Sequence, residues 1–211
     1  KVADVSESEV KRAARPPFTT STLQQAASSR LGLSPSSTMR IAQKLYEAGH
    51  ITYMRTDSVN IGVPARAAIV AAVEKKFGKK YAESRAFATK SKNAQEAHEA
   101  IRPTRVEKES VGNTSEQKKL YKLIWARAVA SQMADAKMLR SRIVANTSKS
   151  DLLGKSDLLV PDFIATGSRV IFDGWLKADP DTRSDDVELP KVAAGEDIDV
   201  KRVSAEEKQT A

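Results

Sequence analysis

A tyrosine and an arginine stand two residues apart in the segment Ile51-Thr-Tyr-Met-Arg-Thr-Asp-Ser58. The pattern from His50 to Arg55 predicts a short strand, with Ile51, Tyr53 and Arg55 on one face. A phenol, whose ordinary pKa is about 10, is a weak nucleophile at neutral pH. A neighbouring guanidinium favours the phenolate and can also hold a phosphate oxygen. The pair is therefore suited to attack on a phosphodiester, although a Tyr–Arg pair on a strand more often belongs to an ordinary surface.

A second candidate is the histidine in Glu96-Ala-His98-Glu99-Ala-Ile-Arg102. A zinc-protease helix needs a second histidine four residues after the first, but Arg102 stands there and the only other histidine is His50. This spacing excludes such a zinc site. The chain has no cysteine, which also excludes disulfides and thiolate metal sites. His98 is then either a buried core histidine or part of a site made with other polar residues.

Four blocks, taken in their order along the chain, resemble the signature segments of type IA DNA topoisomerases. They are residues 16–26, 42–47, 51–58 and 95–104. Tyr53-Met-Arg-Thr-Asp-Ser58, with its methionine, resembles bacterial topoisomerase I in particular. The resemblance is strong over about residues 13–140 and moderate beyond, where Phe172-Asp-Gly-Trp175 also resembles the family's arch. Four ordered blocks are far more specific than any one of them.

The resemblance implies a role for each candidate residue. Tyr53 matches the nucleophile that attacks one DNA strand and becomes joined to its 5′ phosphate. Arg55 matches the arginine that assists at the scissile phosphate. His98 matches the histidine implicated in DNA binding and in supporting the tyrosine. The implied activity is relaxation of negative supercoils without ATP, through a phosphotyrosine intermediate.

The family also implies magnesium, bound by an Asp-x-Asp-x-Glu cluster with a separate glutamate and lysine. No such cluster occurs in this sequence, because Asp197-x-Asp199 is followed by Lys201 where the glutamate should stand. We therefore expect Mg²⁺ to be bound by residues outside this chain. The sequence is then predicted to be a central fragment that needs the remaining domains of the same polypeptide and is inactive alone.

Local signals predict the elements that must position these residues. Hydroxyl residues at Thr19–Thr22, in the segment Ser34-Pro-Ser-Ser37 and at Ser115 are placed to cap three helices. Another helix is expected after Pro64, with a short one over 95–101. Before the first helix, Val2, Val5 and Val10 suggest one strand. After about Met138, period-two patterns predict short antiparallel strands. These cover residues 142–145, 158–160, 163–166, 169–172 and 198–201.

These elements predict an α+β fold, in which a helical, winged-helix-like domain is inserted into a split antiparallel β arch domain. Residues 1–13 are expected to form the first strand segment of the arch. Residues 14–138 are expected to form the helical domain that carries the catalytic tyrosine. Residues 139–211 are expected to return to the arch, so that its two segments lie side by side.

Charge favours a nucleic-acid partner. The chain carries a net charge of +8, and residues 151–211 hold 8 basic against 14 acidic side chains, so residues 1–150 carry +14. A basic region attracts polyanions in a salt-dependent way, and single-stranded DNA is the partner that the family implies. No apolar run approaches the roughly 20 residues of a membrane span, and we expect a cytoplasmic, bacterial protein.

A transcription regulator is the alternative that the helices leave open. The two helices expected between Thr19 and Gly49 have a helix-turn-helix outline, which could place the second in a major groove. Its exposed face carries Arg40, Gln43, Lys44 and Glu47 and is only modestly basic. A regulator would require a specific duplex, whereas a topoisomerase segment should prefer single strands.

Overall fold

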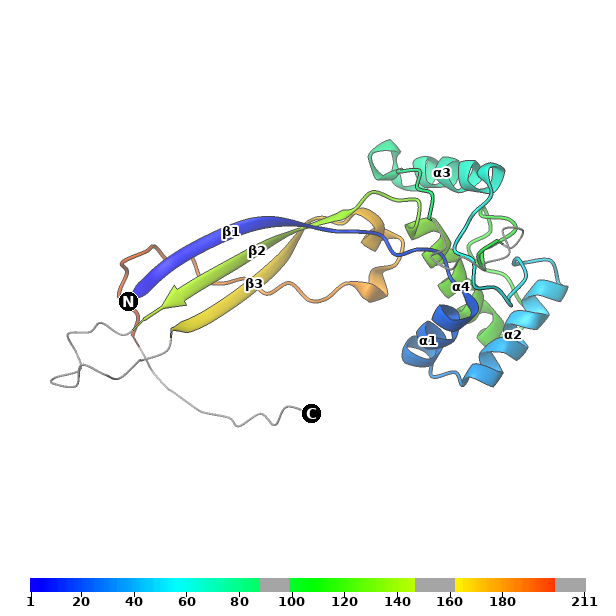
Figure 1. The fold of residues 1–211 in the computed structure, drawn as a ribbon, viewed down its shortest axis with the longest axis horizontal. Coiled ribbons are helices and arrows are strands. Elements are labelled where there is room, and N and C mark those ends of the chain that lie inside the picture. The colour runs from blue at the N-terminus through cyan, green and yellow to red at the C-terminus, as the bar shows by residue number, and fades with distance from the viewer. Residues whose placement is uncertain (88–98, 147–161, 200–211) are drawn as a thin grey trace. The chain divides into compact units, whose positions relative to one another are not determined.

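The computed structural model describes residues 1–87, 99–146 and 162–199, and it divides into two compact units. The sheet unit is made of residues 1–10, 138–170 and 185–211, and the helical unit of residues 11–137 and 171–184. Figure 1 shows the helices of the second unit gathered around α4 and the three strands running side by side. The expected mixture of helices and strands is confirmed.

The first two helices begin at the predicted caps. Helix α1 (Thr20–Leu31) follows Thr19, whose side chain accepts from the Thr22 N–H, while the Thr22 side chain accepts from the Thr19 N–H. Two N–H groups that the helix leaves unpaired are thereby satisfied. Helix α2 (Pro35–Glu47) follows Ser34, whose side chain accepts from the Ser37 N–H. Pro35 is the first helical residue, and its fixed φ angle already suits a helix.

The remaining helices are α3 (Val63–Phe77) and α4 (Ser115–Ala130), with short 3₁₀ turns η1 (Lys79–Tyr81), η3 (Gly174–Lys177) and η4 (Pro180–Thr182). The cap of α4 is Thr114 rather than the predicted Ser115, which is the first helical residue. Helix α4 packs against α1, α2 and α3 and is buried along most of its length from Leu120 to Ala130. It is the core element of the helical unit.

The sheet has three strands, β1 (Val2–Arg12), β2 (Ala136–Ala145) and β3 (Phe163–Phe172), in the order β1-β2-β3. Lys1 and Asn146 exchange hydrogen bonds, and Ser141 Oγ donates to Glu7 Oε1, so β1 and β2 run antiparallel. In β1 the residues from Ala3 to Glu9 are all exposed. This part of the strand therefore owes its order to pairing rather than to a buried face.

Several expected elements differ in the structure. The strand predicted over residues 50–55 is wrong, because only an isolated bridge from Ile51 to Pro103 forms there. Residues 99–101 of the expected short helix are not helical, and 95–98 lie outside the described residues. The two strands expected at 163–166 and 169–172 are one continuous strand.

Two of the expected strands are not described in full. Residues 158–160 lie outside the described residues, as do 200 and 201. Residues 198–199 are described and are not in a strand. Among the described helices none is both long and apolar enough to cross a membrane.

Candidate active site around Tyr53

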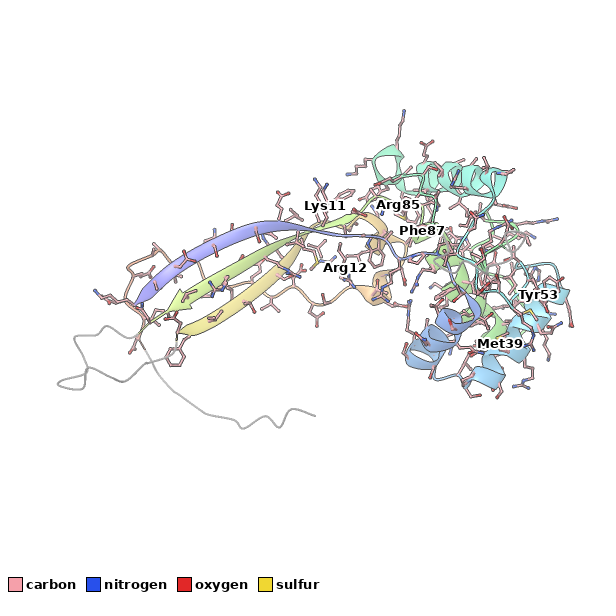
Figure 2. The ribbon with its side chains drawn as sticks, in the orientation of Figure 1. Lys11, Arg12, Met39, Tyr53, Arg85 and Phe87 are labelled. Atoms are coloured by element: carbon pink, nitrogen blue, oxygen red, sulfur yellow. The ribbon has the colours of Figure 1, made fainter. Side chains whose placement is uncertain are left out.

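The residues after Ile51 alternate between solvent and core. Tyr53, Arg55 and Asp57 are exposed, whereas the side chains between them point inward. These inward residues are Met54, Thr56 and Ser58. Ile51, expected to share a face with Tyr53, is instead buried. Tyr53 is 45% exposed and lies at the surface of the helical unit (Figure 2). The alternation is that of a strand, but within the described residues the segment forms only the isolated bridge from Ile51 to Pro103.

A threonine hydroxyl from α1 holds the backbone after Tyr53. Thr20 Oγ1 donates to the carbonyls of Met54 at 2.8 Å and of Thr56 at 3.1 Å, and it accepts from the Thr56 N–H at 2.9 Å. The Thr20 N–H also donates to Thr56 O at 2.9 Å. One side chain in the first turn of a helix thus fixes the backbone on both sides of Arg55.

A second threonine holds the backbone before Tyr53. Thr52 Oγ1 donates to Ala100 O at 2.7 Å and accepts from the Arg102 N–H at 2.9 Å, while Thr52 N–H donates to Arg102 O at 2.9 Å. Buried polar groups that are fully bonded in this way resist displacement. Thr20 and Thr52 therefore clamp the three residues from Tyr53 to Arg55 from both ends.

The segment that follows position 98 closes around the same loop. The Ile101 N–H donates to Phe18 O, Thr104 N–H to His50 O, and Ala100 N–H to Asn60 O. Together with the bonds of Thr20 and Thr52, these bonds link residues of the first, third and fourth blocks of the sequence. Their common function is to support the loop that carries Tyr53.

A partly buried ion pair adds to these contacts. Glu99 Oε1 accepts from Gly62 N–H at 2.8 Å, and Glu99 Oε2 pairs with Arg102 Nη2 at 2.5 Å. The carboxylate therefore ties the residues after position 98 to the start of α3. His98 itself lies outside the described residues, so its predicted contact with the tyrosine stays a prediction.

One aromatic neighbour of Tyr53 was not anticipated from the sequence. Tyr46, in the last turn of α2, lies with its ring centroid 5.2 Å from that of Tyr53 at an interplanar angle of 66°, an edge-to-face contact. Tyr46 is 40% exposed. The buried residues Ile41, Ala42 and Leu45 define the inward face of α2, and Tyr46 lies outside that face. A large aromatic residue at such a position is the sequence signal that could have identified Tyr46.

Comparison with known proteins assigns the chain to a family. A family profile described as DNA topoisomerase matches residues 1–211. The chain belongs to the type IA DNA topoisomerase family. DNA topoisomerase 1 of Synechocystis is 45% identical over 194 residues, which are 86% of this chain and 20% of that protein. The enzyme of Streptomyces coelicolor is 42% identical over 219 residues, covering 97% of this chain and 22% of the relative.

A solved structure supports the same assignment. Full-length topoisomerase I of Thermotoga maritima matches with a TM-score of 0.75 at 35% identity, over 92% of this chain and 32% of that one. The chain spans about a fifth of the length of the Synechocystis and Streptomyces coelicolor proteins. Both are named DNA topoisomerase 1, and a topoisomerase is an isomerase. The fold described above is one that topoisomerase I adopts.

Two other aromatic residues are structural. Tyr121 and Trp125 of α4 are 1% and 7% exposed, so both rings belong to the core of the helical unit. Tyr121 Oη donates to Lys108 O at 2.7 Å, and Trp125 Nε1 donates to Val106 O at 2.7 Å. Burial, and then the nearby Glu107 carboxylate, raises the pKa of Tyr121 to about 12.

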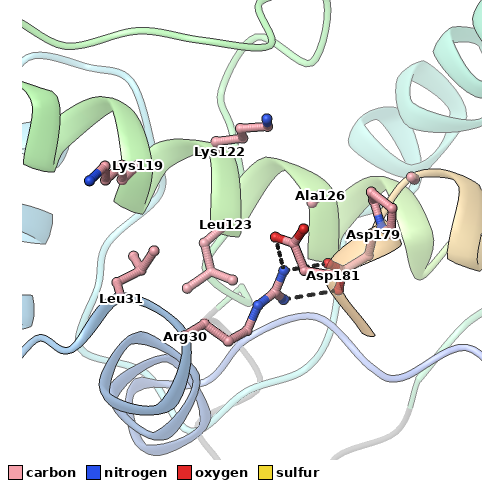
Figure 3. Close-up of a pocket in the computed structure, with 10 residues that line it drawn as sticks. Arg30, Leu31, Lys119, Lys122, Leu123, Ala126, Asp179 and Asp181 are labelled. Carbon is pink, nitrogen blue, oxygen red and sulfur yellow. Dashed lines mark hydrogen bonds and ion pairs between the residues drawn. The ribbon is translucent and has the colours of Figure 1, made fainter. Parts of the chain in front are cut away.

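A cavity lined by both charged and apolar residues lies elsewhere in the helical unit, between α1, α4 and η4. Its volume is about 400 Å³, and Arg30, Lys119, Lys122 and Asp181 are among its lining residues. Figure 3 shows the Arg30 guanidinium between two carboxylates, with hydrogen bonds of 2.7 Å to the buried Asp179 and 2.9 Å to Asp181. Within the described residues no group of three or more His, Cys, Asp and Glu side chains could hold a metal ion.

Proposed function

We propose that this chain supplies the nucleophile of a type IA topoisomerase. The Tyr53 oxygen attacks a DNA phosphodiester, forms a bond to the 5′ phosphate and releases the 3′ hydroxyl of the neighbouring nucleotide. The reverse attack by that hydroxyl reseals the strand. The observation that carries this proposal is an exposed tyrosine and arginine on a loop whose backbone is clamped by Thr20 and Thr52.

The chemistry suits the residues. Exchange of one phosphate ester for another conserves the bond energy, so resealing needs no ATP, and a covalent intermediate divides one hard step into two easier ones. Arg55, exposed beside Tyr53, is placed to offset the charge that develops on the phosphoryl oxygens. His98 is proposed to help engage the DNA and support the tyrosine. Strand passage through the open break then relaxes negative supercoils.

We propose that single-stranded DNA is the bound form of the substrate. Residues 1–150 carry the +14 charge, which attracts the phosphate backbone, and the proposed reaction has to hold one strand that it cuts. A DNA substrate of this kind would be met in the cytoplasm of a bacterial cell. A transcription regulator would instead bind one duplex sequence, and the clamped loop that presents Tyr53 would have no role in that activity.

The finer architecture is part of the proposal. A winged-helix-like domain over 14–138 is inserted between two parts of a β arch, 1–13 and 139–211. The described residues do not fit a magnesium site, since they lack a suitable donor cluster. The Mg²⁺ of the family is therefore expected to be held by other parts of a longer polypeptide. The 211 residues alone are expected to bind DNA weakly and not to cleave it.

Substitution of the nucleophile tests the proposal. The full-length protein that contains these residues is incubated with 3′-end-labelled single-stranded DNA and magnesium, and the products are separated on a denaturing gel. A shifted band that contains protein and labelled DNA is expected, because the 5′-phosphotyrosine keeps the labelled segment. Tyr53→Phe removes only the hydroxyl, so the band should vanish while DNA binding persists.

Three controls give this experiment its meaning. Tyr121→Phe removes a buried hydroxyl instead and should leave the covalent band in place. The isolated 211 residues should give no band. A band that survives Tyr53→Phe would disprove the assignment of the nucleophile, and stronger binding to a specific duplex than to single strands would favour a regulator.

A further inference from the structure

The two exposed tyrosines Tyr46 and Tyr53 form a contact that the proposed reaction does not yet use. Both rings are large apolar groups left partly in solvent, at 40% and 45% exposure. They nevertheless meet edge to face, with centroids 5.2 Å apart and planes 66° from parallel. This is the favoured geometry for an aromatic pair, because the positive edge of one ring meets the negative face of the other.

The threonine clamps leave a degree of freedom that this contact removes. Thr20 and Thr52 bond backbone atoms of residues 52, 54 and 56, and none of those bonds involves the Tyr53 ring. Among the described residues, no hydrogen bond or ion pair is made by the Tyr53 side chain. Rotation about its side-chain torsions is then limited chiefly by the packing of the ring itself, and Tyr46 is its aromatic neighbour.

Tyr46 is well fixed for this purpose. It lies in the last turn of α2, whose residues Ile41, Ala42 and Leu45 are buried in the helical unit. Beyond the helix, His50 N–H donates back to Leu45 O at 2.9 Å, so the turn that links Tyr46 to the Tyr53 loop is closed by a hydrogen bond. The helix and the loop are thus held together near both tyrosines.

We infer that Tyr46 is a positioning residue, which holds the Tyr53 ring so that its hydroxyl is presented to the scissile phosphate. Tyr46 does not itself touch the reacting atoms. Its contribution is to narrow the orientations of the nucleophile before attack, and misplacement by about 1 Å can slow a reaction by about a hundredfold. This inference rests on the proposed role of Tyr53.

The test separates chemistry from binding in the full-length protein. Tyr46→Ala removes the ring, and Tyr46→Phe keeps the ring without its hydroxyl. Single-turnover cleavage is measured at saturating single-stranded DNA, and the Kd for the same DNA is measured separately with the Tyr53→Phe nucleophile variant as host. Tyr46→Ala should lower the cleavage rate constant by about ten- to a hundredfold with an unchanged Kd, and Tyr46→Phe should cleave as the unmodified protein does.

Each alternative outcome overturns the inference in a recognisable way. A weaker Kd with an unchanged rate constant would mean that Tyr46 stacks on a nucleobase. Equal losses in Tyr46→Ala and Tyr46→Phe would mean that its hydroxyl is what matters, and no loss in either would mean that it has no role. If Tyr46→Ala fails to fold, Tyr46→Leu keeps an apolar side chain without a ring and should show the same slow cleavage.

The proposed function fails separately from this inference. Loss of the covalent band in Tyr53→Phe together with normal cleavage by Tyr46→Ala would overturn only the positioning role. A band that persists in Tyr53→Phe would overturn both.

Discussion

Tyr53 and Tyr121 belong to the same helical unit, and each is tied to the stretch between residues 99 and 108, but in opposite ways. Near Tyr53 the hydrogen bonds hold the backbone, through Thr20 and Thr52, and the phenol is left exposed. At Tyr121 the phenol itself is bonded, at 2.7 Å to Lys108 O and 3.3 Å to Arg105 O, and only 1% of the residue is exposed.

The contrast shows why one tyrosine is available for chemistry and the other only stabilises the fold. Burial raises the pKa of Tyr121 to about 12, so its phenolate is disfavoured. Burial also shields the phenol oxygen from any DNA strand. The loop of Tyr53 gains comparable rigidity without enclosing the hydroxyl. Hydrogen bonds placed on the backbone therefore allow a residue to be both fixed and accessible.

The largest effect on this contrast, short of removing Tyr53, should come from Arg55→Ala. Loss of a group that offsets transition-state charge slows catalysis by about a hundred- to a thousandfold. The single-turnover rate constant of cleavage should fall accordingly in the full-length protein, while the melting temperature stays the same because Arg55 is exposed. Arg55→Lys keeps the charge but loses the planar fork and should recover part of the rate. Normal cleavage by Arg55→Ala would remove it from the site.

The next effect should come from the clamp itself. Thr20→Val keeps the side-chain shape but removes a hydroxyl that makes three hydrogen bonds to Met54 and Thr56. Leaving such groups unpaired destabilises a protein by about 1–3 kcal/mol, measurable by urea unfolding, and the looser loop should also cleave DNA more slowly. Thr20→Ser retains the hydroxyl and should restore most of both. If Thr20→Val and Thr20→Ser behave alike, the hydroxyl does not hold the loop.

An effect of similar size is expected from His98→Ala, which should weaken DNA engagement more than chemistry. Loss of a hydrogen bond to a charged group is worth about 1.5–3 kcal/mol, so the Kd for single-stranded DNA should rise by about tenfold or more. His98→Asn, which keeps a polar donor of similar size, is the matched control. An unchanged Kd with a lower cleavage rate would assign His98 to the chemical step alone.

Local signals predicted much of the scaffold. Hydroxyl residues ahead of apolar periodicity marked the segments in which α1 and α2 begin, because a cap and its first turn are contiguous in sequence. Period-two patterns predicted only residues 142–145 of β2, and they divided β3 into two strands. The arrangement of the three strands in one sheet follows from hydrogen bonds such as Lys1 to Asn146, which no local pattern reports.

The loop of Tyr53 marks the limit of such prediction. The sequence pattern from His50 to Arg55 predicted a strand, but the backbone of this loop is bonded to the side chain of Thr20 and, at Thr52, to residues 100 and 102. Alternation reports which side chains are buried and not what the backbone bonds to. Residues 171–184, which were expected in the arch, belong to the helical unit. They too are held by contacts that are distant in sequence, such as the hydrogen bond from Trp175 Nε1 to Arg12 O.

The smallest expected effect is the contribution of Tyr121 to the pH dependence of the free energy of unfolding. Its pKa is raised on folding from 10.0 to about 12, so the folded state keeps this proton longer than the unfolded state. The resulting stabilisation is fully present below pH 10 and is lost as pH rises toward 12. Tyr121→Phe lacks both the hydrogen bonds and the titration, so it should be less stable by about 1 kcal/mol at pH 8.

That difference between the two proteins should narrow above pH 10, close at about pH 10.7 and reverse at higher pH, because the stabilisation lost by titration then exceeds the roughly 1 kcal/mol from the hydrogen bonds. Comparing them cancels the groups they share, including Arg127, whose pKa burial lowers to about 10 and whose contribution changes with pH in the opposite direction. Urea unfolding followed by far-UV circular dichroism at pH 8, 10 and 11 measures the gap. A gap that stays constant over this range would show that the Tyr121 phenol titrates alike in both states, and the contrast with the exposed nucleophile would then rest on access alone.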